Sequence, residues 1–196
     1  MGPNAVLQLA AALRAEGGDA LAAEVFGAAG QSWLLEVPPT LMVDEAVPAA
    51  LSDALWEVYP HGAAKVAAEA GRRTADYVVA NRIPDVAKRL LRVLPDWLAA
   101  RLLLTAIRKN AWTFAGSGTC AVAVPGEALV LDDNPMPMPG AIWHRAVIGR
   151  MVASLLHPAT RLDHVTCLHS DTRACFAVRP PGSDGAAPCV KCRMRR

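Results

Sequence analysis

The sequence predicts an α+β fold in which N-terminal helices precede an antiparallel sheet that carries one packed helix. Residues 4–109 repeat apolar side chains at helical spacing, whereas most of the later chain consists of short apolar runs separated by turn residues. The 196 residues are 53% hydrophobic, which is enough to bury a sizeable core, and the 14 glycines and 15 prolines act as breaks between elements.

Proline and glycine delimit the expected helices. Gly17 and Gly18 end a first helix, and Asp19 is suited to cap a second one. Pro48 falls in a first turn, and Pro84 and Pro95 open two further helices in the basic middle of the chain. The expected helices cover residues 4–15, 19–30, 48–58, about 61–78, 85–94, 96–109 and about 139–156.

The strands are expected where apolar runs are short, β-branched or aromatic, and bounded by turn signals. Gly116-Ser117-Gly118 and Pro125-Gly126 separate the first three runs, and Ser170-Asp171-Thr172 separates the last two as in a hairpin. The expected strands cover residues 111–114, 119–124, 128–131, 162–168 and 174–179.

Composition and charge exclude several classes of protein. The net charge of +2 combines an acidic opening, a basic middle and four basic residues in the last eight, and a nucleic-acid binder would usually show a larger excess. No signal peptide and no apolar run of membrane-spanning length is present, so we expect a cytoplasmic protein with at most peripheral membrane contact.

The predicted organisation is a helical segment over residues 1–45, a domain over 46–180, and a flexible basic tail over 181–196 that contains Cys189 and Cys192.

Three stretches of the chain resemble one family. They are AGRRTADYVVANRIP at residues 70–84, AWTFAGSG at 111–118 and NPMPMPGAIWHRAV at 134–147. The chain is similar, over about residues 51–179, to the J proteins of bacteriochlorophyll biosynthesis, which were historically labelled 4-vinyl reductases and contain the vinyl-4-reductase domain. The resemblance implies a fold similar to small subunits of the transport-protein-particle complex, a homodimer, and an apolar ligand site that serves pigment synthesis.

The chain shows no motif for a redox cofactor. Gly116-Ser117-Gly118 lacks the third glycine of a dinucleotide fingerprint and precedes a predicted strand, and no NAD or flavin motif occurs elsewhere. Cys189 and Cys192 form a lone pair where an iron–sulfur cluster needs four thiolates. We therefore favour a magnesium-tetrapyrrole-binding accessory protein or carrier for pathway enzymes. A 4-vinyl reductase that uses an external donor and a scaffold that binds only proteins remain as alternatives.

A tetrapyrrole site needs apolar walls, an axial donor and cations for the carboxylate arms. The candidate walls are Trp112, Phe114 and Trp143, and His144 is the candidate axial ligand. Ordinary core packing for the aromatics and a structural hydrogen bond or a metal-site role for the histidine are the alternatives. The candidate partners of a propionate are Arg72, Arg73 and Arg82, which otherwise form a solvated helix face.

A zinc site is implied by a further resemblance. Related sensor proteins with this domain hold zinc at positions that match Cys167 and Cys175, with a glutamate where this chain has His164. Imidazole and thiolate both suit Zn²⁺, so His164 is an acceptable substitution. A fourth ligand would come from His144, Cys120 or water, and inert buried thiols are the alternative.

Overall fold

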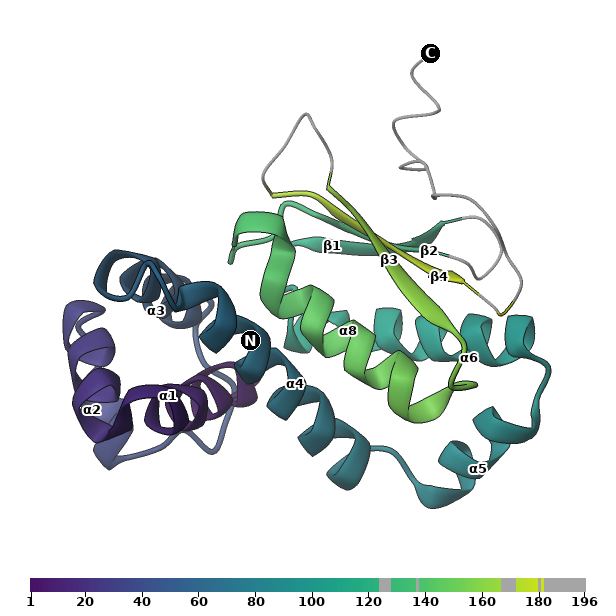
Figure 1. Cartoon of the computed structure of the whole chain (residues 1–196), viewed down its shortest axis with the longest axis horizontal. Coiled ribbons are helices and arrows are strands. Elements are labelled where there is room, and N and C mark those ends of the chain that lie inside the picture. Colours follow the sequence, from purple (N-terminus) through teal and green to yellow (C-terminus); the bar gives the residue numbers. More distant parts are fainter. Residues whose placement is uncertain (124–127, 137, 167–171, 180, 182–196) are drawn as a thin grey trace, which may run out of the picture.

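A computed structural model describes residues 1–123, 128–136, 138–166, 172–179 and 181. The chain is built from N-terminal helices, a four-stranded antiparallel sheet, and helices that cover one face of that sheet (Figure 1). The predicted α+β class is therefore confirmed. The predicted tail over residues 182–196 lies outside the described residues.

The first three helices form a helical unit beside the sheet (Figure 1). They are α1 (Asn4–Ala28), α2 (Trp33–Glu36) and α3 (Ala46–Val58). The break expected at Gly17 and Gly18 is confirmed, because α1 consists of two helical stretches that meet at a kink where both glycines leave the helical conformation, Gly18 with a φ of 72°. Arg14 Nε donates a hydrogen bond of 2.7 Å to Asp19 Oδ1 across this kink.

A long helix joins this unit to the sheet. Helix α4 (Ala63–Asn81) packs on α1 along one side and on α8 along another, as Figure 1 shows. It is followed by α5 (Asp85–Val93) and α6 (Asp96–Lys109), each of which starts directly after a proline, as predicted.

The segment after α6 departs from the prediction. Residues 111–114 were expected to form a strand, but the structure has a 3₁₀ helix, η1 (Ala111–Thr113). The backbone N–H groups of Phe114 and Ala115 both donate to the carbonyl of Ala111, which closes a tight turn. These two N–H groups are therefore not available to pair with a neighbouring strand. Aromatic and β-branched content alone therefore misled the strand prediction, because tertiary contacts decide whether such a segment forms a strand.

The sheet contains two hairpins whose inner strands pair with each other. Its strands lie in the order β1-β2-β4-β3, and all three pairings are antiparallel. The strands are β1 (Thr119–Ala123), β2 (Ala128–Asp132), β3 (Arg161–Thr166) and β4 (Ala174–Arg179), and between the hairpins lie η2 (Pro139–Ala141) and α8 (Ile142–Leu155). This agrees closely with the expected strands and the expected helix over 139–156.

The core lies between the helices and one face of the sheet. Leu129, Leu131, Phe176 and Val178 point into the main cluster of buried side chains, which α1, α3, α4, α6 and α8 complete. The alternate residues of β2 and β4 form a smaller buried cluster on the other face of the sheet, as the period of two requires. No helix in the described part of the chain is long and apolar enough to span a membrane.

Candidate functional site

His144 is the most unusual titratable residue of the core. It lies in the first turn of α8 and is 1% exposed. Its ring packs edge-on against Trp143, at 4.9 Å between centroids, and against Phe114, at 6.2 Å. Three of the residues that the sequence proposed for a tetrapyrrole site therefore meet at one place, although 30 positions separate Phe114 from His144.

The hydrogen bonding of His144 defines its tautomer. Nε2 lies 3.3 Å from the carbonyl oxygen of Phe114, and because a carbonyl can only accept, Nε2 carries the proton and donates it. Nδ1 is buried and has no hydrogen-bond partner within the described residues. Burial lowers the pKa of His144 to about 4, an effect that the bond to Phe114 only partly opposes. The site therefore holds a neutral imidazole with one lone pair left free.

The remaining aromatic candidate does not join this cluster. Trp112 is 58% exposed, because the 3₁₀ turn of η1 directs it away from the core. Trp143 is buried and Phe114 is half-buried against the core, so the apolar part of the candidate site consists of these two rings.

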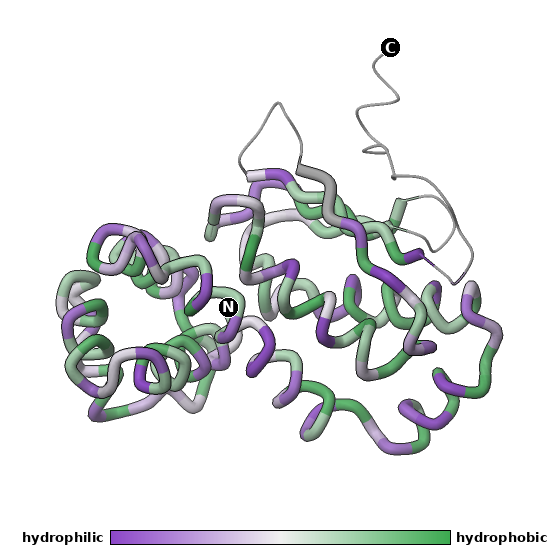
Figure 2. The backbone as a smooth tube through the Cα atoms, in the orientation of Figure 1, coloured by the Kyte–Doolittle hydropathy of each residue, from purple (hydrophilic) through white to green (hydrophobic). Residues whose placement is uncertain are grey.

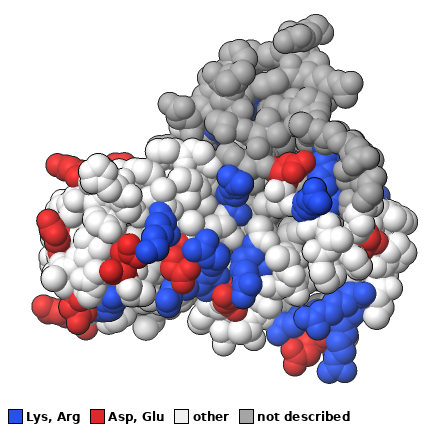
Figure 3. All heavy atoms as spheres, in the orientation of Figure 1, with Lys and Arg blue, Asp and Glu red and all other residues white. Residues whose placement is uncertain are grey.

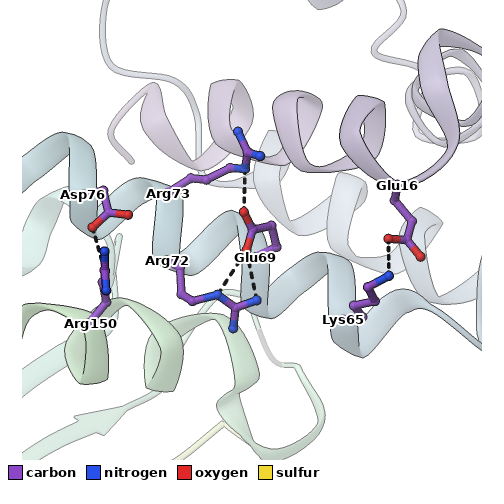
Figure 4. A network of polar contacts seen from close by, with 7 residues as sticks. All are labelled: Glu16, Lys65, Glu69, Arg72, Arg73, Asp76 and Arg150. Carbon is purple, nitrogen blue, oxygen red and sulfur yellow. Dashed lines mark hydrogen bonds and ion pairs between the residues drawn. The ribbon is translucent and has the colours of Figure 1, made fainter. Parts of the chain in front are cut away.

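The three candidate arginines lie on α4 or at its end, outside the aromatic cluster. Arg72 and Arg73 both bind Glu69, with distances of 2.9 Å and 2.8 Å between their nitrogens and its carboxylate oxygens. Figure 4 shows both side chains converging on that carboxylate. Arg82 is exposed and has no ion pair within the described residues. Glu69 was not among the residues expected at the site, although its spacing of three and four positions from the arginines is the signal of helical ion pairs.

The same surface of α4 carries further ion pairs to its neighbours. Asp76 accepts a hydrogen bond of 2.7 Å from Arg150 on α8, and Glu16 on α1 binds Lys65 at 2.7 Å (Figure 4). The bond from Lys65 lowers the pKa of Glu16, and that of Lys65 is raised by Glu16. These pairs connect the three helices at their exposed edges.

A small pocket lies between α1 and α4 beside these charges. Its volume is about 210 Å³, and Glu16, Lys65, Glu69 and Arg72 contribute to its lining. This is below the roughly 300–1,000 Å³ typical of small-molecule sites, so a macrocycle does not fit into it.

The Gly116-Ser117-Gly118 stretch has a structural role. Glu45 accepts a hydrogen bond of 2.6 Å from the backbone N–H of Ser117 and one of 2.7 Å from its hydroxyl. Gly116 takes a φ of 55°, and a Cβ there would lie 2.3 Å from Glu45 Oε2. The stretch therefore forms a turn that fastens the sheet to the start of α3.

The proposed zinc ligands lie only partly within the described residues. Cys167 lies outside the described residues, and within the described ones no three His, Cys, Asp or Glu side chains form a group that could hold a metal ion. In the backbone register His164 pairs with Phe176 and Cys175 with Val165, so these two candidates are not directly opposed. Burial raises the pKa of Cys120 to about 11, which keeps it a thiol at neutral pH. The zinc site stays a prediction from the sequence.

Two curated proteins are similar to the chain over almost its whole length. Both are named bacteriochlorophyll synthase 23 kDa chain. The one from Cereibacter sphaeroides is 38% identical over 93% of this chain and 91% of its own length. The one from Rhodobacter capsulatus is 36% identical over 96% of this chain and 91% of its own length. No family model matches the sequence.

Solved structures of H-NOX domains share the fold. An Fe(II) unliganded H-NOX protein mutant from K. algicida superposes with a TM-score of 0.60 at 13% identity, over 91% of this chain and 96% of its own. An H-NOX structure described as probing the function of heme distortion gives a TM-score of 0.57 at 10% identity, over 96% and 100% of the two chains. At such identities the likeness concerns the fold alone. The similarity to the vinyl-4-reductase domain and to transport-protein-particle subunits stays an expectation from the sequence.

Proposed function

Because the chain belongs to the family of the bacteriochlorophyll synthase 23 kDa chains, we propose that it serves bacteriochlorophyll biosynthesis by binding a magnesium-tetrapyrrole intermediate. Its role is that of an accessory protein, which shields the pigment and presents it to the enzymes of the pathway. The relatives are named as chains of a synthase, and this supports an association with such enzymes.

Family membership carries this proposal, and the fold supports it. Two of the structurally similar proteins are described in terms of heme, one as probing heme distortion in the H-NOX family and one as modulating heme redox potential through porphyrin distortion. The same arrangement of helices and sheet therefore accommodates a tetrapyrrole in other proteins. A fold by itself does not establish a function, so the chemistry has to come from the residues of this chain.

His144 supplies that chemistry. Its Nδ1 is neutral and has no hydrogen-bond partner within the described residues, and a neutral imidazole nitrogen is a good metal ligand. Because His144 is 1% exposed, a magnesium-tetrapyrrole reaches this atom only if neighbouring side chains move, and Phe114 and Trp143, whose rings meet that of His144 edge-on, would then line the pigment. The two aromatic rings would then pack against the macrocycle and no longer against the imidazole.

Arg82 is the one of the three candidates that has no ion pair within the described part of the chain. Arg72 and Arg73 already share the carboxylate of Glu69, so either would have to give up an ion pair in order to bind a propionate. Arg82 is exposed at the end of α4 and can form a charge-assisted hydrogen bond without this exchange.

The proposal is tested by titrating the purified protein with divinyl magnesium-protoporphyrin monomethyl ester, without a reductant, and recording absorption and fluorescence. We expect a saturable band shift at about one pigment per chain or per dimer. His144→Gln is expected to weaken binding about tenfold or more, which corresponds to about 1.4 kcal/mol per factor of ten. The exposed His61 provides the control, because His61→Gln should leave the titration unchanged.

The magnesium-free ester separates ligation of the metal from simple burial. The wild-type protein should prefer the magnesium form, and His144→Gln should bind both forms equally. The absence of any saturable shift would refute pigment binding and favour the protein-only scaffold. Turnover of the divinyl pigment on addition of a reductant would favour the reductase.

A further inference from the structure

Helix α5 exposes apolar side chains that do not contribute to the core of the fold. None of its nine residues is buried, yet it carries Val86, Leu90 and Val93 as exposed side chains, and Trp97 follows in the first turn of α6. We propose that these four residues, called here the α5 ridge, contact the surface of an anionic lipid membrane. This interaction surface is independent of the pigment site.

The exposed apolar residues of α5 lie on one side of the helix. At 100° per residue, Val86, Leu90 and Val93 fall within about 60° of arc. Val93 is 79% exposed and Trp97 is 62% exposed, so the ridge presents both aliphatic and indole surface to solvent. Hydrophilic and hydrophobic segments alternate along this part of the chain, as Figure 2 shows. This is the amphipathic pattern of helices that lie in a membrane interface, where tryptophan is also enriched.

The other side of α5 holds it to the rest of the molecule. Leu91 is half-buried against the core, as is Leu94 directly after the helix, and Arg92 Nη2 donates a hydrogen bond of 3.5 Å to the carbonyl of Ser154 on α8. Leu91 lies about 100° or more around the helix from Val86, Leu90 and Val93. The helix is therefore attached by one edge and directs the ridge outward.

Positive charge surrounds the ridge. Residues 82–109 contain seven Lys or Arg against two Asp, and Arg82, Arg89, Arg92 and Arg101 are exposed. Figure 3 shows a group of blue side chains gathered over this end of the molecule. Arg89 lies next to the apolar arc, where an interfacial helix places cations that reach lipid phosphates while the apolar face enters the acyl boundary.

Charge and shape favour a membrane over the other occupants of this surface. In a symmetric pair of copies of this chain, the same patch would lie on both sides, and the two sets of arginines would repel each other. The ridge is the outer side of a helix rather than a groove, so it offers no pocket for an anchor residue of a protein partner. An anionic bilayer supplies both an apolar layer and a complementary charge.

The test is co-sedimentation of the full chain with vesicles. We expect binding to phosphatidylcholine vesicles that contain phosphatidylglycerol, little binding to phosphatidylcholine alone, and weaker binding at high salt. Val93→Glu should weaken binding about tenfold or more, because it removes apolar contact and adds repulsion. Val37→Glu is the matched control, since Val37 is 65% exposed outside the ridge and should tolerate the change. Arg89→Gln should weaken binding about fivefold, and Arg145→Gln on α8 should have little effect.

The proposal is overturned if Val93→Glu sediments with anionic vesicles as the wild-type protein does, since another part of the chain then binds the lipid. It is also overturned if no binding to anionic vesicles is found. Loss of a dimer in Val93→Glu by analytical ultracentrifugation, with vesicle binding intact, would assign the ridge to a second copy of this chain. Loss of binding to a purified pathway enzyme, again with vesicle binding intact, would assign it to a protein partner.

Discussion

At the scale of single residues, His144 couples the stability of the fold to pH. Its pKa is about 4 in the folded protein, below the ordinary value of 6.5 that it recovers on unfolding. As the pH falls, the unfolded chain therefore takes up the proton first. The stabilisation associated with the neutral imidazole is fully present above pH 6.5 and is lost as the pH falls from there towards 4.

This predicts a pH dependence that one substitution removes. Between about pH 7.5 and about pH 5, the shifted pKa of His144 accounts for a loss of about 2 kcal/mol in the free energy of unfolding. His144→Gln cannot take up this proton, so its loss over the same interval should be smaller by about that amount. Urea unfolding of both proteins at the two pH values measures the difference. Equal losses would show that the imidazole is not held neutral in the core.

The sequence predicted part of this site and missed the rest for physical reasons. Trp143 and His144 are adjacent on a predictable helix, and Phe114 meets them as proposed. Trp112 was also proposed as a wall, but a strand and a 3₁₀ turn project their side chains in different directions, and the turn exposes it. That turn is stabilised by contacts with residues distant in sequence, such as the hydrogen bond from Gly2 to Thr113, and local propensities carry no information about such contacts.

At the scale of elements, the close crossing of α4 and α8 depends on a glycine, Gly71, which has no side chain. A Cβ on Gly71 would lie 2.6 Å from the carbonyl oxygen of Trp143 and 2.8 Å from the Cβ of Ala146. Both neighbours belong to the helix that carries His144, so the close approach of these helices positions the candidate site. Pro84 and Pro95 predict where their helices begin. The residues around Gly71, in contrast, do not indicate that this glycine lies against the backbone of another helix.

Two glycine substitutions test this crossing. Gly71→Ala should destabilise the protein by about 1–3 kcal/mol, because the clash with backbone atoms outweighs the gain of about 1 kcal/mol in helix propensity. Gly149→Ala in α8 is the matched control, because its Cβ would meet Leu162 at an ordinary 3.6 Å. It should be neutral or stabilising by up to about 1 kcal/mol. Thermal and urea unfolding of the two variants give the comparison, and equal effects would contradict the close crossing.

At the scale of the whole molecule, the helical unit and the sheet are joined by contacts that are distant in sequence. Glu45 and Ser117 are 72 positions apart, and their two hydrogen bonds connect the start of α3 to the entry of β1. The helices and strands were largely predictable because each one has its own periodicity and its own breaks. Pairings over such distances leave no comparable signal in a single sequence.

Removing this connection should lower the stability of the whole fold. Glu45→Ala loses both hydrogen bonds, and because they are partly exposed we expect a cost of about 1 kcal/mol, or a fall of about 2–4 °C in Tm. Glu57→Ala, at an exposed position of α3, should change Tm much less. Differential scanning calorimetry provides the measurement. The same Tm for both variants would mean that the connection contributes nothing to stability.

The lack of buried residues in α5 also has a kinetic consequence. None of the residues of α5 is fully buried and Leu91 is only half-buried against the core, so opening this helix exposes little apolar surface to water and costs less free energy than unfolding the molecule. The backbone amides of α5 should therefore exchange with deuterium faster than those of α4 or α8, while the rest of the protein stays folded. Deuterium uptake measured peptide by peptide would then show α5 as a separate cooperative unit, whose protection rises when a partner covers it.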